Sequence, residues 1–439
     1  MEPPLLLYAC KSAFRLTGGL STRITVSFAL RVDIKSQTAE ELKALFQDWG
    51  QPGYRVTQLL EWLYVHRVAK WEQMTNLPKA LRERLEGAFT LNSLDLVRKQ
   101  GSRDTTQKFL WRLADHSLIE SVLIPANPAL YGEASDRHTL CVSTQVGCAY
   151  GCKFCASGLE GWKRNLEVHE IVEQVLAVER EESRIGPNHD PSAERTQPQD
   201  KARWQMADGK WQMTDSRPPA SPPPPASPPP ASLQSAPSRL VSNLVIMGMG
   251  EPLANYDNLL KALGILNAPW GGGIGARKIT ISTSGLAPEI RKLADEPVQY
   301  RLAISLHGAT DETRVKIMPI NKRYPLRELT AACEYYQKQK GRMVTFEYIL
   351  IAGVNDFLAE VKPLASLAKR LNAKVNLIPY NRVEGLPWER PEEQQQEAFL
   401  SALEAENVTA TLRREKGHDI DAACGQLRLR TERELASKS

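Results

Sequence analysis

Three cysteines stand close together in the segment GCAYGCKFC, where Cys148, Cys152 and Cys155 have the spacing C-x3-C-x2-C. A structural zinc site commonly takes four ligands, often as two separated C-x2-C pairs, and this sequence has no second pair. Three thiolates on one short loop instead suit a [4Fe–4S] cluster in which one iron is left open to a further ligand. A substrate can chelate the open iron and take an electron from it. The spacing therefore predicts an iron–sulfur cluster, with a closed site completed by a distant cysteine as the alternative.

The segments that follow predict the elements that position this loop. From about residue 138 onward, six apolar, strand-like runs alternate with helical patterns. The runs are HTLCVSTQV, NLVIMGMG, KITISTSG, RLAISLHG, MVTFEYILI and KVNLIPYN. Six β/α units with strands of the parallel type predict an α/β fold built as a barrel or partial barrel. Chemistry in such barrels lies at the carboxyl ends of the strands, and the cysteine loop directly follows the first run.

Residues that can bind a ligand follow the later strands at the same end. They are Gly250 and Glu251 in GMGEP, Ser282 in ISTSG, Ser305 and His307 in ISLHG, and Asn381 in IPYN. Each one alone is as easily a turn former. As an ordered set behind the cysteine loop, they predict a shared site. Two further cysteines, Cys141 and Cys424, are either buried small hydrophobes or part of that site.

The composition excludes several classes of protein. No apolar run approaches the roughly 18 to 20 residues of a membrane span. Seven cysteines, four of them within residues 141–155, do not suit a secreted disulfide framework and favour a reducing compartment. The formal net charge is +5, and residues 1–32 carry +3 of it, from four Lys or Arg against one acid. Charge alone therefore gives no argument for nucleic-acid binding.

The chain of 439 residues divides into a barrel and four accessory segments. Residues 1–32 are expected to be an extension without structure, although their composition also resembles a transit peptide. Residues 187–237 hold 13 of the 29 prolines and predict a stiff, disordered insert. We assign 33–97 to a helical domain, 98–186 and 239–428 to the barrel, and 429–439 to a C-terminal tail.

The helical domain is predicted from its caps and apolar stripes. Thr38 and Glu41 fit a capping box at the start of the first helix. Helical spacing joins Leu42, Leu45, Phe46 and Trp49 in that helix, and Val56, Leu59, Leu60 and Leu63 in a second. Aromatic and basic side chains then interleave at Trp62, Tyr64, His66, Arg67, Lys70 and Trp71. We interpret the domain as an RNA-binding type, with core and solvated-face roles as the alternative.

These motifs together resemble a known family. The cysteine spacing after the first strand is similar to that of the radical S-adenosylmethionine (SAM) superfamily. Eight ordered blocks, over about 33–186 and 239–428, resemble the RlmN family of dual-specificity RNA methyltransferases. The blocks are ESVLIP, TLCVSTQVGC, MGMGEPLANYDN, ITISTSG, AISLH, MPINK, NLIPYN and GHDIDAACGQL. The resemblance implies a partial (β/α)6, TIM-like radical SAM barrel behind a small N-terminal helical domain.

The family's reaction is methylation of adenosine C2 in 23S rRNA and in tRNA next to the anticodon. C2 is electrophilic, so it does not attack a methylsulfonium. The resemblance implies that Cys424 first takes a methyl group from one SAM, and that the cluster cleaves a second SAM to a 5′-deoxyadenosyl radical. That radical takes a hydrogen from the methylated Cys424, whose carbon radical adds to the base. Glu120 would accept the C2 proton, and Cys141 would attack the Cys424 sulfur to release the product.

The resemblance also implies the ligands and partners. Binding of SAM falls to Gly250, Glu251, Ser282, Ser305, Leu306, His307 and Asn381, with Phe154 near the adenine. Each chain would hold one [4Fe–4S] cluster on three cysteines and use two SAM molecules per turnover. Expected partners are 23S rRNA, tRNA and an electron donor such as flavodoxin or ferredoxin. The enzyme is expected to be a cytoplasmic monomer with no membrane partner. Candidate phosphate contacts are Lys163, Arg164, Arg277, Lys278, Lys322, Arg323, Arg413 and Arg414.

Three alternatives remain open from the sequence. A Cfr-type enzyme would methylate C8 of adenosine with the same cluster and cysteines. Another radical SAM oxidoreductase would give no purpose to Cys141 and Cys424. A cluster-stabilised RNA-binding module would need no chemistry at Cys424.

Overall fold

A ten-stranded mixed sheet forms the centre of the computed structural model, which describes residues 31–102, 105–126, 137–184, 204–207, 210–213, 239–413 and 425–436. The strand order is β1-β2-β3-β4-β9-β10-β11-β12-β13-β14. Six neighbouring strands correspond to the six predicted runs: β4 (His138–Cys141), β9 (Asn243–Ile246), β10 (Ile279–Thr283), β11 (Arg301–Ser305), β12 (Thr345–Leu350) and β13 (Lys374–Pro379). They pair in parallel throughout, which confirms the α/β fold with a partial barrel.

The sheet extends beyond these six strands on both sides. On one side, β1 (Asp95–Gly101), β2 (Gln107–Arg112) and β3 (Leu118–Pro125) continue it as antiparallel strands. On the other side, β14 (Ala410–Leu412) adds a seventh parallel strand. Among the described residues, β1 and β14 are not hydrogen-bonded to each other, so the barrel is open. A separate hairpin of β5 (Gln145–Gly147) and β6 (Trp162–Asn165) stands at the mouth.

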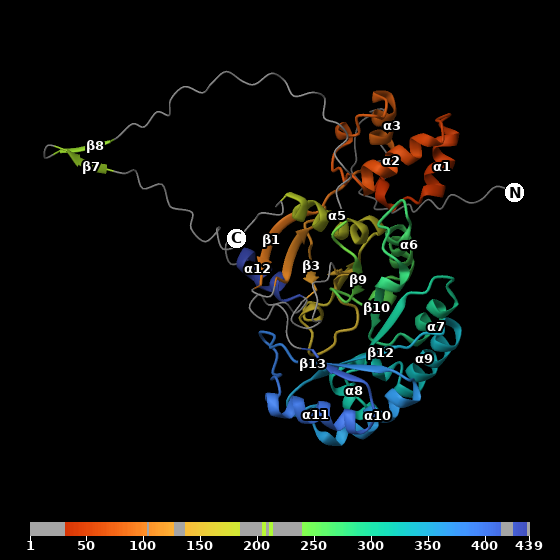
Figure 1. The fold of residues 1–439 in the computed structure, drawn as a ribbon, viewed down its shortest axis with the longest axis vertical. Coiled ribbons are helices and arrows are strands. Elements are labelled where there is room, and N and C mark those ends of the chain that lie inside the picture. The colour runs from red at the N-terminus through yellow and green to blue at the C-terminus, as the bar shows by residue number, and fades with distance from the viewer. Residues whose placement is uncertain are drawn as a thin grey trace, which may run out of the picture.

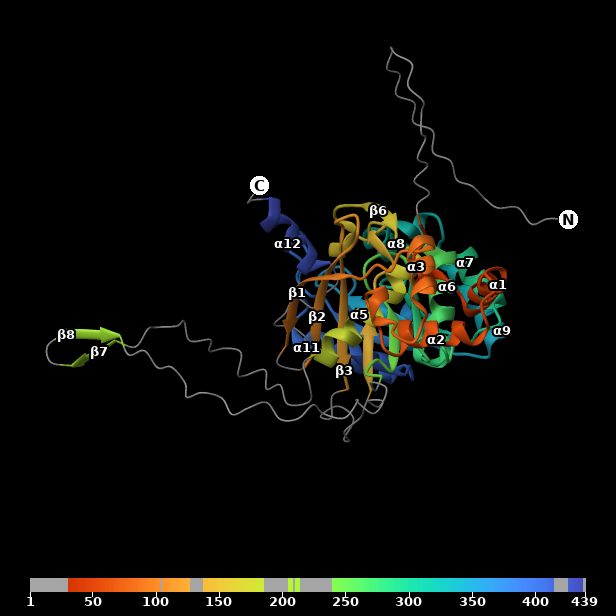
Figure 2. The same ribbon diagram turned by 90° about the horizontal axis from the view of Figure 1, so that it is seen from above.

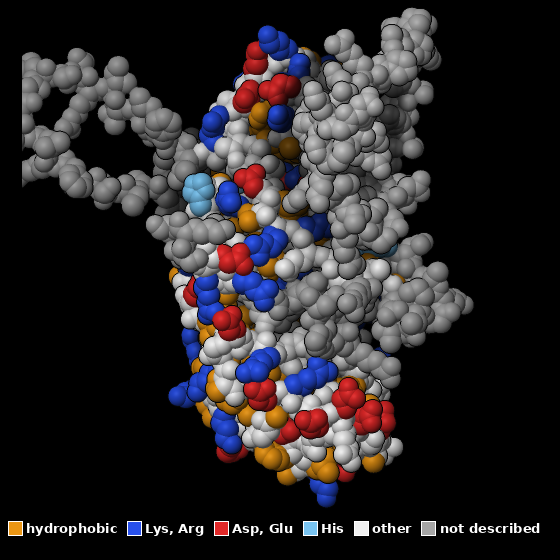
Figure 3. Space-filling model, turned by 90° about the vertical axis from the view of Figure 1, so that its left-hand side faces the viewer, with side chains coloured by type: hydrophobic (Ala, Val, Ile, Leu, Met, Phe, Trp, Pro, Cys, Tyr) orange, Lys and Arg blue, Asp and Glu red, His pale blue; other side chains and the backbone are white. Residues whose placement is uncertain are grey.

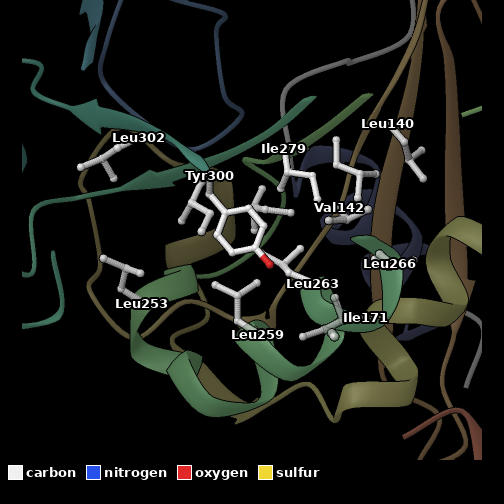
Figure 4. Packing of buried hydrophobic residues seen from close by; sticks show 14 of the residues in the cluster. Leu140, Val142, Ile171, Leu253, Leu259, Leu263, Leu266, Ile279, Tyr300 and Leu302 are labelled. Atoms are coloured by element: carbon white, nitrogen blue, oxygen red, sulfur yellow. The ribbon is translucent and has the colours of Figure 1, made fainter. Parts of the chain in front are cut away.

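Helices cover the outer face of the sheet, as Figure 1 shows. They are α5 (Val168–Arg184), α6 (Tyr256–Asn267), α7 (Ala287–Asp295), α8 (Asp311–Ile317), α9 (Leu326–Lys340), α10 (Val361–Arg370) and α11 (Glu393–Ala405). Short 3-10 turns at η3 (Ala156–Gly158), η5 (Pro252–Asn255), η6 (Ala276–Lys278), η7 (Pro319–Lys322) and η8 (Leu358–Glu360) complete the connections. Figure 4 shows the core between sheet and helices, where Leu140, Ile279 and Leu302 from strands face Ile171 and Leu263 from α5 and α6. Burial of these branched side chains is the main force that fixes the layers.

The predicted helical domain is confirmed. It comprises η1 (Ile34–Ser36), α1 (Ala39–Asp48), α2 (Tyr54–Tyr64), η2 (Trp71–Gln73) and α3 (Lys79–Ala88). Both hydrogen bonds of the capping box are present, because Glu41 N–H donates to Thr38 Oγ1 and Thr38 N–H donates to the Glu41 carboxylate. The domain packs on α5, where Arg67 pairs with Glu179 at 3.2 Å.

Burial decides the role of three of the six aromatic and basic residues in this stretch of the domain. Tyr64, Arg67 and Trp71 are buried, so these three side chains serve the core rather than an RNA surface. Tyr64 stacks edge-on against Trp270 of the barrel, with ring centroids 5.6 Å apart. The interpretation as an RNA-contacting stretch is therefore wrong for these three residues.

Two segments differ from the expected boundaries. Within the proline-rich insert, β7 (Trp204–Ala207) and β8 (Lys210–Met213) form an antiparallel hairpin, which lies away from the sheet in Figure 2. The rest of the insert and residues 1–30 lie outside the described residues. The expected tail belongs largely to helix α12 (Gln426–Ala436), which lies beside β1 and β3 in Figures 1 and 2 and buries Leu429 and Thr431.

Of the helices that the structure describes, none has the length and apolar character needed to cross a membrane.

Gly248 lies where the chain after β9 crosses the chain after β4. A Cβ on Gly248 would stand 2.5 Å from the carbonyl oxygen of Val142 and 2.6 Å from the amide nitrogen of Ser143, both of them backbone atoms. We therefore expect Gly248→Ala to lower the free energy of unfolding by about 2 kcal/mol. In the control Gly264→Ala, the exposed helical glycine has open space, and the change should raise stability by up to about 1 kcal/mol. Thermal unfolding midpoints of both variants test this, and equal midpoints would contradict the close crossing.

Candidate functional site

The three predicted cluster cysteines lie on one loop between β5 and β6, after the carboxyl end of β4. Backbone hydrogen bonds fix the loop. Cys148 N–H donates to the Gly161 carbonyl at 3.2 Å, and Cys155 N–H donates to the Cys152 carbonyl at 3.1 Å. Lys153 N–H donates to the Ile317 carbonyl at 2.9 Å, which ties the loop to α8. The sequence-predicted placement of the loop is therefore confirmed.

The environment of the thiols fits a bound cationic group. Burial first, and the neighbouring Cys155 in addition, raise the pKa of Cys148 to about 12. Burial and the same neighbouring thiols also raise the pKa of Cys152. Three thiolates so close together repel one another in a low dielectric, and iron ions remove that cost, since metal binding requires the deprotonated ligand. In the part of the chain described, no three His, Cys, Asp or Glu side chains are placed to hold a single metal ion. A [4Fe–4S] cluster does not need such a group, because each of its thiolate ligands binds a different iron.

The loop is joined to the GMGEP motif by Gln145. Its side-chain oxygen accepts the backbone N–H of Glu251 at 2.9 Å and that of Ala149 at 3.3 Å. Gly250 lies against this side chain, with a φ of 103°, and a Cβ there would stand 2.6 Å from Gln145 Cβ. A glycine is therefore required at position 250, because only a residue without a Cβ lets the backbone lie this close to Gln145. Gln145 was not identified from the sequence, because Glu251, its partner in the GMGEP motif, is 106 residues away in the chain.

The carboxylate of Glu251 is buried at the mouth of the barrel. It accepts the backbone N–H of Leu253 at 3.1 Å and that of Ser284 at 2.7 Å. Burial raises the pKa of Glu251, and these hydrogen bonds lower it. A carboxylate held in this way is suited to an ammonium group, whose charge would compensate for the desolvation.

Ser282 and Ser305 come together at the carboxyl ends of β10 and β11. Their hydroxyl oxygens are 3.3 Å apart, and the Ser282 residue is buried while Ser305 is half-buried. Two adjacent hydroxyls can donate to or accept from a polyol or ammonium group. Leu306, the next residue, is fully buried, and its N–H donates to the Glu347 carbonyl at 3.0 Å, which joins the end of β11 to β12.

His307 has the left-handed φ of 57° and is held on two sides. Its Nδ1 accepts the Ile349 N–H at 3.0 Å, and the Phe154 ring lies edge-on to its ring at 4.9 Å between centroids. Burial, with the nearby Arg314 charge in addition, lowers the pKa of His307 to about 3. The ring is therefore neutral near pH 7, and it can contact an apolar or aromatic ligand face but does not supply a positive charge.

A cavity of about 960 Å³ lies on the inner face of the sheet. Cys141, Asn381 and Arg413 line it, together with Glu347. Asn376 Nδ2 donates to Glu347 Oε1 at 2.9 Å, whereas Glu347 Oε2 is buried without a hydrogen-bond partner. Burial raises the pKa of Glu347. This free oxygen is available to an N–H or O–H group of a molecule in the barrel, and Glu347 was not identified from the sequence.

Glu120 lies apart from the cavity wall and is enclosed by protein donors. Its carboxylate pairs with Lys108 Nζ at 2.9 Å and accepts the backbone N–H groups of Gly425 and Arg428. Gly425 directly follows Cys424, which lies outside the described residues. The structure therefore connects Glu120 with the start of α12.

Comparisons with known proteins agree with this arrangement. A family model described as "Ribosomal RNA large subunit methyltransferase N-terminal domain" matches residues 32–91, and the "Radical SAM superfamily" model matches residues 234–365. The solved structure of a radical SAM methyltransferase from Sphaerobacter thermophilus is 38% identical, with a TM-score of 0.72, over 90% of this chain and 98% of that one. "Probable dual-specificity RNA methyltransferase RlmN 3" of Opitutus terrae is 49% identical over 91% of this chain and 95% of its own length. The chain belongs to the RlmN family. A further relative, "Dual-specificity RNA methyltransferase RlmN" of Anaeromyxobacter dehalogenans, is 41% identical over 90% of this chain and 91% of its own length.

Within this RlmN-family chain, the candidate phosphate contacts separate into groups. Arg164 is paired with both Asp115 and Glu170, whereas the Lys163 side chain is 50% exposed, with its Nζ 3.9 Å from Glu432. Arg277 and Lys278 precede β10 and lie at the end of the barrel opposite the cysteine loop. Remaining at the mouth are Lys322, Arg323 and the cavity-lining Arg413. Arg414 lies outside the described residues.

Figure 3 shows Lys and Arg side chains interspersed with Asp and Glu on the face turned to the viewer. Since no single-sign patch covers the described part of that face, RNA contact there would depend on individual basic residues rather than on a broad positive field.

The low pKa of His307 predicts a specific loss of stability in acid. The unfolded chain binds a proton on this imidazole near pH 6.5, whereas the folded chain does so only near 3. Its contribution is therefore complete above about pH 6.5 and declines as pH falls, by up to about 1.4 kcal/mol per unit. We expect His307→Gln to flatten the fall of the unfolding midpoint between about pH 7.5 and 5. Replacing the exposed His116 by Gln gives the baseline, and parallel curves for wild type and His307→Gln would contradict burial of a neutral imidazole.

Proposed function

We propose that this member of the RlmN family is a radical SAM RNA methyltransferase that methylates C2 of adenosine in 23S rRNA and in tRNA next to the anticodon. The RNA substrates are supported by the names of the relatives, which are dual-specificity RNA methyltransferases. The observation that carries the chemistry is the position of Gly425. A Cβ there would stand 2.8 Å from Ser157 N, two residues beyond Cys155. The residue after Cys424 therefore adjoins the cysteine loop.

Cofactor binding follows from the donors at the mouth. We assign the [4Fe–4S] cluster to Cys148, Cys152 and Cys155, and the SAM ammonium to Glu251. The hydroxyls of Ser282 and Ser305, together with Leu306, His307 and the side chain of Asn381, would hold the rest of SAM, with Gly250 allowing its approach. When bound, the cluster supplies the electron for reductive cleavage of SAM. We infer two SAM molecules per turnover, one for each stage of the transfer.

The chain's own thiols perform the remaining chemistry in this proposal. Cys424 takes a methyl group and later joins the target base through that carbon. Cys141 lines the cavity and is buried, and it would attack the Cys424 sulfur to release the methylated base as a disulfide forms. Glu120 as acceptor of the C2 proton stays a prediction.

The setting of the enzyme follows from the same chemistry. Thiolate-bound clusters need a reducing compartment, and the RNA substrates are cytoplasmic, so we propose that the enzyme is cytoplasmic. We also propose that it is a monomer. An electron donor of the flavodoxin or ferredoxin type would reduce the cluster.

Each of the three loop cysteines should be necessary for the cluster. We expect Cys148→Ala, Cys152→Ala and Cys155→Ala to lose the iron, the sulfide and the visible absorbance of anaerobically reconstituted protein, because three ligands hold the cluster. Cys333→Ala is the control, since Cys333 is buried on α9 and should leave the iron content unchanged. A loop variant that keeps full iron and sulfide would contradict this ligand assignment.

The reaction is tested with reconstituted protein, methyl-labelled SAM and unmodified rRNA fragments or tRNA, with product nucleosides resolved by mass spectrometry. We expect label in 2-methyladenosine. Cys424→Ala should abolish it with the cluster intact, and Cys141→Ala should accumulate a covalent RNA adduct. Label at C8 would show the Cfr-type enzyme instead. Deoxyadenosine without labelled RNA would show radical chemistry on another substrate, and RNA binding without any chemistry would show a binding module.

A further inference from the structure

The phenol of Tyr380 is buried near the cysteine loop and carries a hydroxyl that the protein does not use. Tyr380 directly follows β13 and is 1% exposed. Its hydroxyl oxygen is buried, and no hydrogen-bond partner for it exists among the described residues. An unsatisfied buried hydroxyl costs free energy, so its presence in a folded protein calls for an explanation such as a bound water, a bound ion or a redox role.

Hydrogen bonds hold Tyr380 and the segment after it in place. The Tyr380 N–H donates to the Leu350 carbonyl at 3.0 Å, which holds the residue beside the end of β12. Further along the same segment, Trp388 Nε1 donates to the Lys153 carbonyl at 2.9 Å. Lys153 is itself part of the cysteine loop, so this bond ties the segment after β13 to that loop.

Cys155 is the ionisable group that affects the phenol most strongly. Burial first raises the pKa of Tyr380, the Val383 backbone N–H lowers it, and the charge of a nearby Cys155 thiolate raises it. The phenol is therefore a neutral O–H donor near pH 7. The Val383 N–H lies near the phenol oxygen without forming a hydrogen bond to it. The hydroxyl hydrogen is thus left for an acceptor in the direction of Cys155.

We propose that the Tyr380 hydroxyl donates a hydrogen bond to a sulfur of the [4Fe–4S] cluster on the side held by Cys155, and thereby raises the reduction potential of the cluster. This inference rests on the proposed function, which assigns the cluster to the cysteine loop. Hydrogen bonds to the sulfurs are among the factors that set the potential of such a cluster. The reduced cluster carries one more negative charge, so the bond to it is stronger and favours gain of the electron. The proton stays on the tyrosine oxygen, and only the electron from the reductant moves.

The first measurement is the reduction potential of the cluster in Tyr380→Phe, which removes only the hydroxyl. Anaerobically reconstituted wild type and variant, loaded to equal iron and sulfide and free of SAM, are titrated with a titanium(III) reductant and mediators, and the reduced cluster is followed by EPR. We expect the one-electron equilibrium to shift roughly tenfold toward the oxidised cluster, which corresponds to a potential lower by about 59 mV. Equal potentials would overturn the inference.

A second measurement detects the hydrogen bond itself. In reduced wild type that has been exchanged into deuterium oxide, deuterium ENDOR should show one coupled deuteron that is missing in Tyr380→Phe. Replacement of Tyr380 by 3-fluorotyrosine, whose hydroxyl is the stronger donor, should move the potential above that of wild type. A tyrosine that only packs against the loop would change neither the deuteron signal nor the potential in this order, and that result would contradict the proposal.

The matched control is Tyr336→Phe, because Tyr336 is a fully buried tyrosine of α9 whose hydroxyl donates to the Tyr300 carbonyl at 2.6 Å. This change should leave the potential at the wild-type value. It should lower the unfolding midpoint of the cluster-free protein, since a buried carbonyl loses its donor.

Cluster-free Tyr380→Phe should not have a lower unfolding midpoint than wild type, since the hydroxyl that it loses has no partner there. A fall as large as that of Tyr336→Phe would show that the Tyr380 hydroxyl is satisfied within the protein, and the inference would be wrong.

The same samples separate failure of this inference from failure of the proposed function. If wild type binds no iron and sulfide on the three loop cysteines, the proposed cluster fails and the hydrogen bond falls with it. If the cluster is present and reducible, but Tyr380→Phe matches wild type in potential and in deuteron signal, the hydrogen bond alone is wrong and the proposed function stands.

Discussion

The buried guanidinium of Arg314 is the interaction on which the mouth of the barrel depends. Its Nε donates to the Leu306 carbonyl at 2.9 Å, and its two terminal nitrogens donate to the Ser284 carbonyl and to Asn321 Oδ1. Arg314 is fully buried, and burial lowers its pKa to about 10, which still leaves it charged near pH 7. The side chain therefore satisfies carbonyls beyond the ends of β10 and β11 that would otherwise be buried without donors.

Arg314 therefore fixes the backbone segments that orient or carry the ligand-binding residues. Ser284, held through its carbonyl by Arg314, uses its N–H to orient Glu251. Leu306, held in the same way, precedes His307. Cys333 and Cys152 lie near enough to interact with the Arg314 charge, so the cation also offsets negative charge on the cysteine loop. A preorganised site of this kind loses little entropy when its ligand binds.

Local sequence signals were sufficient for the barrel strands, the capping box at Thr38 and the cysteine loop. Each of these depends on residues a few positions apart, where periodicity and spacing carry the information. Gln145, Arg314 and Lys108 were not identified from the sequence, since a single polar residue does not reveal which distant residue it contacts. Gln145 meets Glu251 across 106 residues, and Glu120 meets Arg428 across 308. Such contacts are created by the topology of the sheet, which brings the ends of distant strands to one edge.

The position of the proline-rich insert explains why the site tolerates it. The insert joins the end of α5 at Arg184 to β9, which begins at Asn243, and a helix-to-strand connection lies at the amino ends of the barrel strands. The cysteine loop, Glu251 and His307 lie at the carboxyl ends. Glu179 fixes the returning chain, because its carboxylate accepts the N–H groups of Leu240 and Val241.

The same carboxylate pairs with Arg67 of the helical domain. One buried acid therefore anchors α5, the domain packed on it and the strand that leads into the GMGEP motif. The entropy of closing a longer loop rises only slowly with its length, so additional residues between these fixed points cost little stability. The register of β9 is set by Glu179 and by its parallel pairing with β4 and β10. The position of Glu251 therefore does not depend on the length of the insert.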